Sequence, residues 1–196
     1  MKSRISKEPL KHKWLLKGRE IVLDNLELIK QREEQGGMLV LVKATPDETN
    51  DIVFLLKEAA EWMVASELKH WTPDMFTPES VRSYFDDREV YAAYLNQEPV
   101  GMFTLQGSDP SYWGPLNDDQ YGYLHRLTVR QAFRKRGISE WLLEAAEEIV
   151  LSQGKKALRL DCITHSPKLN AFYQGLGFKH QGVTDMGVRV VNLYER

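Results

Sequence analysis

A short basic stretch with one glycine, Arg134-Lys-Arg-Gly-Ile-Ser139, holds the residues best placed for chemistry in this chain. It follows a strand-like run, residues 121–129, and precedes an amphipathic pattern that begins near Ile138. The first turn of a helix carries backbone N–H groups without an intrahelical partner, and the helix dipole adds partial positive charge there. The stretch therefore predicts a site for a phosphate group, although such a turn also occurs without a ligand.

The spacing of this turn excludes two common phosphate sites. There is no GxxxxGK[ST] motif, and Gly137 lacks the further glycines of a dinucleotide-binding fingerprint. Arg134-x-x-Gly137-x-Ser139 instead resembles the (Arg/Gln)-x-x-Gly-x-(Gly/Ala) signature of the GCN5-related N-acetyltransferases, the GNAT superfamily. In that family the turn binds the pyrophosphate of acetyl-coenzyme A. Ser139 departs from the usual glycine or alanine but is still small.

A second motif, Ser166 to Phe178, follows at a suitable distance. Ser166 is a good N-cap and is followed by a proline that suits the first helical position. The helix presents one apolar face and ends at Gly177; that face is formed by Leu169, Phe172, Tyr173 and Leu176. The segment resembles the Asn-x-x-Leu-x-x-x-Tyr-x-x-x-Gly-Phe segment of the same family. Tyr173 falls where the family places the tyrosine that protonates the departing thiolate, and a core tyrosine is the alternative.

The resemblance implies acetyl-CoA as co-substrate and an N-acetyltransferase that transfers the acetyl group directly to a primary amine through a ternary complex. The alternative is a non-catalytic acyl-CoA-binding regulatory module. The implied cofactor-binding residues are the backbone of Leu127, Thr128 and Val129, the turn residues Arg134, Lys135, Arg136, Gly137, Ile138 and Ser139, and Ser166 in place of the family's asparagine.

The reaction needs a neutral amine, a donor for the oxyanion and an acid for the thiolate. Tyr173 is the predicted acid, and a backbone N–H near Leu127 is the predicted oxyanion donor. His125 is the predicted base, because alternation along a strand places it on the face of Leu127 and Val129. Asp161 is the rival base, and water is a third possibility. A structural role, such as a hydrogen bond to a neighbour, is the alternative for either side chain.

The acceptor side of the predicted site is rich in aromatic residues. Trp71 and Trp113 lie in loops and are predicted to bind a small amine, with closure of the core as the alternative. Nothing in the sequence identifies the amine. No metal is expected, because the five histidines show no ligand spacing.

Composition limits the remaining classes of function. A chain of 196 residues supports one good core, and a net charge of −2 does not favour nucleic acid as a partner. The single cysteine, Cys162, lies in an apolar run and predicts a buried thiol in a reducing compartment. No segment has the pattern of a membrane span or a signal peptide. We therefore expect a cytoplasmic monomer or homodimer.

Two regions are expected. Residues 1–37 form an N-terminal helical extension, with a helix from Trp14 to about Glu34 that ends at Gly36-Gly37. Residues 38–196 form the acetyltransferase domain. Its predicted fold is α/β (α+β), a mixed, mostly antiparallel twisted sheet of about six or seven strands with helices on both faces. The strands at 121–129 and 157–163 are expected to be parallel, because a helix joins them. Further helices are predicted at 46–68, 77–88 and 138–153, and a hairpin at 96–99.

Overall fold

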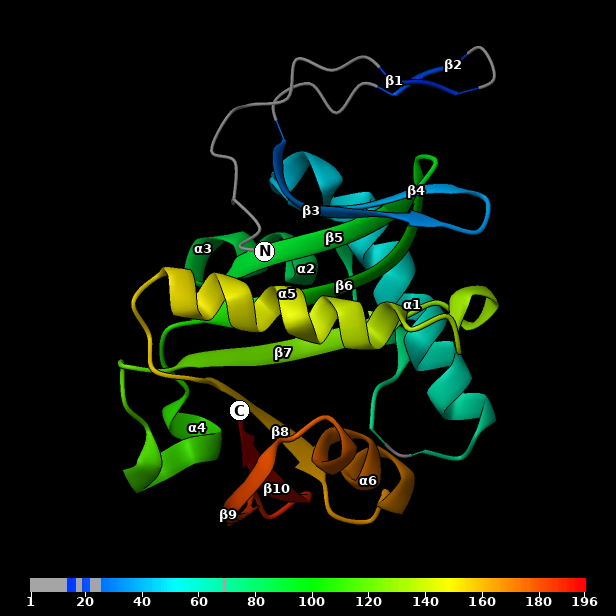
Figure 1. Cartoon of the computed structure of the whole chain (residues 1–196). Coiled ribbons are helices and arrows are strands. Elements are labelled where there is room, and N and C mark those ends of the chain that lie inside the picture. The colour runs from blue at the N-terminus through cyan, green and yellow to red at the C-terminus, as the bar shows by residue number, and fades with distance from the viewer. Residues whose placement is uncertain (1–13, 17–18, 22–25, 69) are drawn as a thin grey trace. The chain divides into compact units, whose positions relative to one another are not determined.

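One eight-stranded mixed sheet and a separate two-stranded ribbon contain the strands of the described chain (Figure 1). The computed structural model describes residues 14–16, 19–21, 26–68 and 70–196. The strands are β1 (Trp14–Leu16), β2 (Arg19–Ile21), β3 (Glu27–Glu34), β4 (Gly37–Lys43), β5 (Glu89–Leu95), β6 (Glu98–Gln106), β7 (Gly122–Val129), β8 (Leu158–Ile163), β9 (Lys179–Asp185) and β10 (Val190–Glu195). The α-helices are α1 (Thr49–Ala65), α2 (Pro78–Arg82), α3 (Tyr84–Asp87), α4 (Pro110–Trp113), α5 (Ile138–Ser152) and α6 (Pro167–Gly175).

The chain divides into two compact units. Unit 1 is Met1–Phe103 with Arg126–Ser139, and unit 2 is Thr104–His125 with Glu140–Arg196. Strands β6 and β7 each belong to both units. Unit 1 therefore contains the strand order β3-β4-β5-β6-β7, and unit 2 contains β6-β7-β8-β10-β9. The ladders β3–β4, β4–β5, β8–β10 and β9–β10 are antiparallel, whereas β7 and β8 are parallel, as the sequence predicts.

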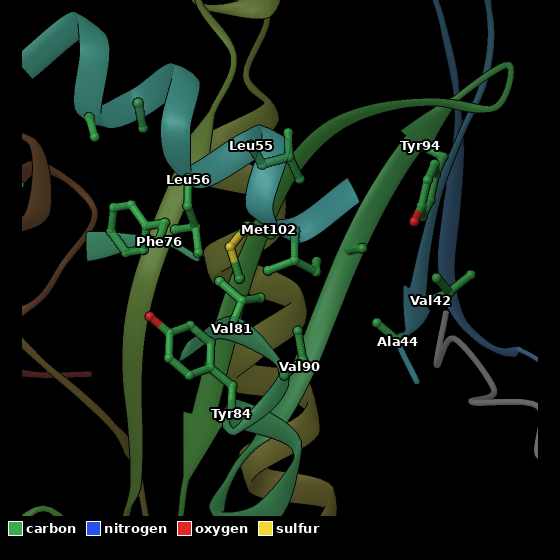
Figure 2. Packing of buried hydrophobic residues seen from close by; sticks show 14 of the residues in the cluster. Val42, Ala44, Leu55, Leu56, Phe76, Val81, Tyr84, Val90, Tyr94 and Met102 are labelled. Carbon is green, nitrogen blue, oxygen red and sulfur yellow. The ribbon is translucent and has the colours of Figure 1, made fainter. Parts of the chain in front are cut away.

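The core of unit 1 is formed by one face of α1 packed on β4, β5 and β6. Ile52, Leu55 and Leu56 are buried on α1, where helical periodicity places them. Figure 2 shows Leu55 and Leu56 gathered with Phe76, Val81 and Met102. The helix predicted for residues 46–68 is therefore confirmed as α1. The helix predicted at 77–88 is interrupted at Ser83 and forms the two short helices α2 and α3.

In unit 2, α5 packs closely against the start of β7. A Cβ atom on Gly122 would lie 2.3 Å from a methyl group of Val150, so only glycine fits at this point. The same helix buries Leu142, Leu143 and Ala146. The close approach fixes the end of α5 against the strand that carries His125.

The N-terminal region is not the helix that the sequence predicts. Within the range 14–34, Trp14–Leu16 and Arg19–Ile21 are paired strands, and Glu27–Glu34 is β3, which pairs with β4. Residues 17–18 and 22–25 of that range lie outside the described residues. Gln35 and Gly36 form the two-residue turn of a tight β3–β4 hairpin, where a break after a helix was expected; Gly36 has a φ of +100°, and Gly37, the first residue of β4, pairs with Glu34. The additional strand β3 raises the sheet to eight strands. The division at residues 37 and 38 stays a prediction.

No described helix has both the length and the apolar character that a membrane crossing requires.

Candidate functional site

The predicted phosphate turn lies in unit 1 and has a distinctive backbone. Lys135 and Gly137 have φ values of +62° and +67°, so the chain turns sharply just before α5 begins at Ile138. Within the described residues, the N–H groups of Gly137, Ile138 and Ser139 have no hydrogen-bond partner. Together with the dipole of a 15-residue helix, these groups form a positive concavity of the kind that binds anions.

Arg32 of β3 fixes the orientation of these N–H groups. Its guanidinium donates to the carbonyl oxygen of Arg136 at 3.0 Å and to that of Gly137 at 3.4 Å. In a trans peptide the carbonyl and the following N–H point in opposite directions, and no described peptide bond is cis. Because both carbonyls point to Arg32, the N–H groups of Gly137 and Ile138 point away from it, toward the same side of the turn.

Glu34 connects this arginine to the turn. It accepts from Arg32 at 2.6 Å and from Arg136 at 3.1 Å. Burial alone would raise the pKa of Glu34, but hydrogen bonds from the Gln35 N–H, Arg136 and Arg32 outweigh it and hold the pKa below its ordinary value. Arg32, Glu34 and Arg136 therefore form a network, here called the turn brace, that stabilises the turn from β3.

The three basic side chains of the turn have different environments. Arg134 lies 4.0 Å from the ring centroid of Trp62 and donates to the carbonyl oxygen of Val129, and burial lowers its pKa. Arg136 belongs to the turn brace. Lys135 is exposed and has no ion pair within the described residues, so it is the side chain best able to reach a phosphate.

The β7–β8 ladder is short. Its parallel register pairs Gly122, Tyr123 and Leu124 of β7 with Leu158, Arg159 and Leu160 of β8 and then ends. Leu127, Thr128 and Val129, predicted to bind the pantetheine arm through their backbone, lie in β7 beyond this ladder.

Arg126 interrupts the regular alternation of β7. Its φ is +58°, which a non-glycine residue rarely adopts and which is typical of a bulge. The alternation argument that grouped His125 with Leu127 and Val129 therefore does not hold across this residue. The Arg126 guanidinium carbon lies 5.1 Å from the ring centroid of Trp71.

His125 and Asp161 lie side by side in unit 2 because of the β7–β8 register. Each follows the last paired residue of its strand, and His125 Nδ1 is 3.6 Å from Asp161 Oδ1. His125 Nε2 is 3.1 Å from Oδ2 of a second carboxylate, Asp109, which begins α4. The ring of Tyr112 lies 5.8 Å from the His125 ring, centroid to centroid. The predicted base and its rival are thus neighbours, and Asp109 joins them.

Tyr173 is buried in unit 2, with 6% of its surface exposed. Its ring packs edge-on against Phe172 and Phe178. Burial, with further contributions from Cys162 and Asp161, raises the pKa of Tyr173. The phenol therefore retains its proton throughout the neutral range, as an acid for a thiolate must.

Helix α6 carries Tyr173 on a differently packed face from the one predicted. Ser166 begins the helix without a side-chain cap, and Leu169 is exposed. Asn170 is buried instead; it donates to the carbonyl oxygens of Ile163 and Ser166 and accepts from Tyr194. This amide connects α6 to β8 and β10, and so fixes the position of the tyrosine.

The two tryptophans predicted to bind the acceptor are core residues in their packing. Trp71 is 7% exposed and packs edge-on against Phe76, and Trp113 is 2% exposed and packs edge-on against Tyr123. Their assignment as acceptor-binding residues stays a prediction, and each ring offers little free surface.

Three residues with clear roles were missed from the sequence: Arg32, Asp109 and Asn170. Arg32 acts across 105 positions, and no local pattern reports such a contact. Asp109 could have been noticed as an N-cap candidate before Pro110 in the loop that precedes the central strand. Asn170 occupies a helical position where a polar residue is ordinarily exposed.

Comparisons with known proteins bear on the family and the fold of this chain. The family model described as Acetyltransferase (GNAT) family matches residues 56–178. YesJ, an uncharacterized N-acetyltransferase of Bacillus subtilis strain 168, is 25% identical over 150 residues, which is 74% of this chain and 83% of that protein. A crystal structure of a GNAT family acetyltransferase from Listeria monocytogenes 4b F2365 has a TM-score of 0.72 at 23% identity and covers 85% of this chain and 99% of that one. The PaiA N-acetyltransferase of Thermoplasma acidophilum, solved in complex with coenzyme A, has a TM-score of 0.62 at 20% identity. The match covers 81% of this chain and 99% of that one.

The mixed sheet and its helices thus define an acetyltransferase fold of the GNAT type. The matched segment covers well over half of the chain and includes both the turn at residues 134–139 and the Tyr173 helix. The chain belongs to the GNAT family of acetyltransferases.

Proposed function

We propose that this protein transfers the acetyl group of acetyl-CoA directly to a primary amine while both substrates are bound. The observation that carries the proposal is the turn held by Arg32. Its N–H groups without hydrogen-bond partners point to the same side of the turn and lie at the N-terminus of a long helix. Such a turn has the fixed partial charges that a pyrophosphate requires. The coenzyme A complex of a protein with the same fold also supports acetyl-CoA as the co-substrate.

The described residues fit the parts of coenzyme A. The N–H groups of Gly137, Ile138 and Ser139 would hold the pyrophosphate, with Lys135 available to a phosphate oxygen. The backbone of Leu127, Thr128 and Val129 would bond the pantetheine arm as an added strand does. Ser166 would stand where the family's asparagine contacts that arm.

Acetyl-CoA, when bound, supplies the thioester carbonyl that the amine attacks. His125 would take a proton from the amine nitrogen as the C–N bond forms, with Asp161 or water as the other candidate bases. A backbone N–H near Leu127 would donate to the carbonyl oxygen as it gains negative charge. Tyr173 would give its phenolic proton to the sulfur as the C–S bond breaks, so that free CoA leaves as a thiol.

Asp109 and Asp161 favour a cationic acceptor. Two carboxylates on either side of His125 would attract an ammonium group, which must give one proton to water before the neutral amine attacks. A small amine therefore remains the proposed acceptor, and Trp71 and Trp113 are the residues proposed to bind it. The protein is proposed to be a monomer or a homodimer.

Thermal unfolding of the purified protein tests the co-substrate first. Acetyl-CoA and CoA at saturating concentration should raise the melting temperature, and ATP should not, because only a ligand of the folded state stabilises it. A screen of primary amines for thiol release then tests the transfer. CoA-dependent stabilisation with no release for any amine would favour the non-catalytic acyl-CoA-binding module. No shift with either CoA compound would contradict both assignments.

A further inference from the structure

Arg126 of β7 places its guanidinium against a cluster of aromatic rings in unit 1. Its Cζ atom lies 5.1 Å from the ring centroid of Trp71, 5.4 Å from that of Phe76 and 5.8 Å from that of Tyr84. The three aromatic residues are buried, whereas Arg126 is only partly buried. Each distance lies within the range of cation–π attraction, so the rings hold the positive charge in place.

The Arg126 guanidinium has no acceptor for its N–H groups within the described residues. It forms no hydrogen bond or ion pair with them, and its nitrogen atoms are not among their buried atoms without a partner, so these nitrogen atoms reach solvent. Aromatic faces attract a cation but accept no ordinary hydrogen bond, so the N–H donors remain available to an anion. Arg88 is different: it lies 4.7 Å from the Tyr84 ring centroid, but it is paired with Asp87 at 2.9 Å.

The backbone of Arg126 is also unusual. Its φ of +58° takes the residue out of the regular alternation of β7, and a bulge of this kind redirects a side chain. Such a conformation is costly for a residue other than glycine, and it is concentrated at functional sites. Because the rings limit the movement of the guanidinium, an anion bound here would cost little side-chain entropy.

The position of Arg126 in β7 indicates which anion it meets. Leu127, Thr128 and Val129, proposed to bond the pantetheine arm, separate Arg126 from the turn proposed to hold the pyrophosphate. Three strand residues span about 10 Å. Arg126 directly precedes Leu127, near which the oxyanion donor is proposed, so it belongs to the thioester end of the arm. A carboxylate of the acceptor is therefore favoured over a phosphate of CoA.

We infer that Arg126 binds a carboxylate of the acceptor through two parallel hydrogen bonds, and that the acceptor is an amino acid. A guanidinium and a carboxylate match in geometry and charge. The inference rests on the proposed acetyl transfer and names the substrate class for it. An amino acid also carries the ammonium group that Asp109 and Asp161 are proposed to attract. Trp71, whose ring has little free surface, would act on this acceptor through Arg126.

Pairs of amino acids and their amides test the inference, because the members of a pair have nearly the same shape and differ in the negative charge. L-lysine with L-lysinamide, L-phenylalanine with L-phenylalaninamide and L-alanine with L-alaninamide are assayed for thiol release from acetyl-CoA. The amino acid of an active pair should have a kcat/KM at least about tenfold above that of its amide. Arg126→Gln should raise the KM for that amino acid about 10- to 100-fold, with a smaller effect on kcat, and should remove the preference. Arg126→Lys keeps the charge without the planar fork and should restore part of it.

Arg88→Gln is the matched control, because Arg88 lies over the same Tyr84 ring but is paired with Asp87. It should keep the preference for the amino acid. If Arg126→Gln does not fold by circular dichroism, Arg126→Lys serves instead, since it keeps a cation over the rings.

Three results would overturn the inference while thiol release persists: equal kcat/KM for amino acid and amide, release only with amines that lack a carboxylate, or an unchanged preference in Arg126→Gln. A loss of CoA affinity in Arg126→Gln would also overturn it and assign Arg126 to a phosphate. If no amine releases thiol, the proposed transfer itself fails. Calorimetric titration of the CoA complex with each pair then tests the carboxylate site alone. Heat with the amino acid but not its amide, lost in Arg126→Gln, would support the site, and no such heat would overturn it.

Discussion

Arg32 and Gly137 lie 105 residues apart in the sequence and are joined by a hydrogen bond from the Arg32 guanidinium to the Gly137 carbonyl. This contact connects β3, a strand that precedes the part of the chain matched by the family model, to the turn proposed to bind pyrophosphate. The arginine is thus a positioning residue: it acts through the turn and requires no contact with the ligand.

Arg32→Gln should weaken binding of CoA about five- to thirtyfold, because it removes two hydrogen bonds to the turn and each is worth about 1 kcal/mol. The N–H groups would remain present but less well oriented. Calorimetry with CoA measures the change. Arg88→Gln, which removes an arginine paired with the exposed Asp87, is the control and should bind CoA normally. Equal affinity in Arg32→Gln and the unchanged protein would remove Arg32 from the binding mechanism.

Glu34 should make the free energy of unfolding decrease as the pH falls into the acidic range. Its pKa is held below the ordinary value of 4.5, so its contribution to stability is complete above that pH and is lost as the pH falls through the lower, folded-state value. Glu34→Gln should therefore reduce the free energy of unfolding at pH 7 and flatten its decline in acid. Urea unfolding at a series of pH values measures both effects. An identical acid slope in the two proteins would contradict the turn brace.

Gly137→Ala should weaken CoA binding by more than its effect on stability explains. A left-handed alanine costs about 1 kcal/mol, and its Cβ would lie 4.0 Å from Nη1 of Arg32, the side chain that orients the N–H groups of the turn. Gly154→Ala is a matched control, because Gly154 has a φ of +79° and nothing within 4 Å of the added atom. Both variants should lose similar stability in urea unfolding, and only Gly137→Ala should lose affinity in calorimetry. Gly137→Glu, which adds a negative charge, should abolish binding. Normal affinity in Gly137→Glu would show that the turn does not hold the pyrophosphate.

Much of the fold follows from local patterns in the sequence. The helices α1, α5 and α6 and the strands β7 and β8 begin and end within a few residues of the predicted bounds, because periodicity, glycine and proline specify them locally. The turn at residues 134–139 was predicted for the same reason, since its basic residues, glycine and flanking elements are contiguous, and its role in phosphate binding stays a prediction.

The failures have a common physical cause. Leu26 and Ile29 have the spacing of a helix, yet β4 offers a hydrogen-bonding edge and Gln35-Gly36 forms a tight turn. Pairing with β4 therefore determines the structure of residues 27–34. Asp109 joins His125 and Asp161 only after three elements are in place. Contacts between segments distant in the sequence determine both the strand at residues 27–34 and the position of Asp109. No local pattern in a single sequence predicts such contacts.

Cys162 should be unreactive in the native protein. Burial, with a smaller contribution from the Asp161 carboxylate, raises the pKa of the thiol to about 12. At pH 8 only about one thiol in ten thousand is then a thiolate, the form that reacts. Modification by iodoacetamide, followed by mass spectrometry, should be at least about a hundredfold slower in native protein than in guanidinium chloride. Comparable rates in the two conditions would show that the thiol is accessible and ionised.

Tyr173→Phe should separate binding from chemistry. The hydroxyl is the proposed proton donor to the thiolate, and the ring keeps its packing on Phe172 and Phe178 without it. CoA affinity should therefore be unchanged, whereas kcat with any amine found by screening should fall about 10²- to 10⁴-fold. Tyr91→Phe is the control: Tyr91 is a buried tyrosine whose hydroxyl bonds Glu89 in unit 1. It should lose about 1 kcal/mol of stability and keep its turnover. If Tyr173→Phe turns over normally, the thiolate takes its proton from another group, and Tyr173 is a core residue of α6.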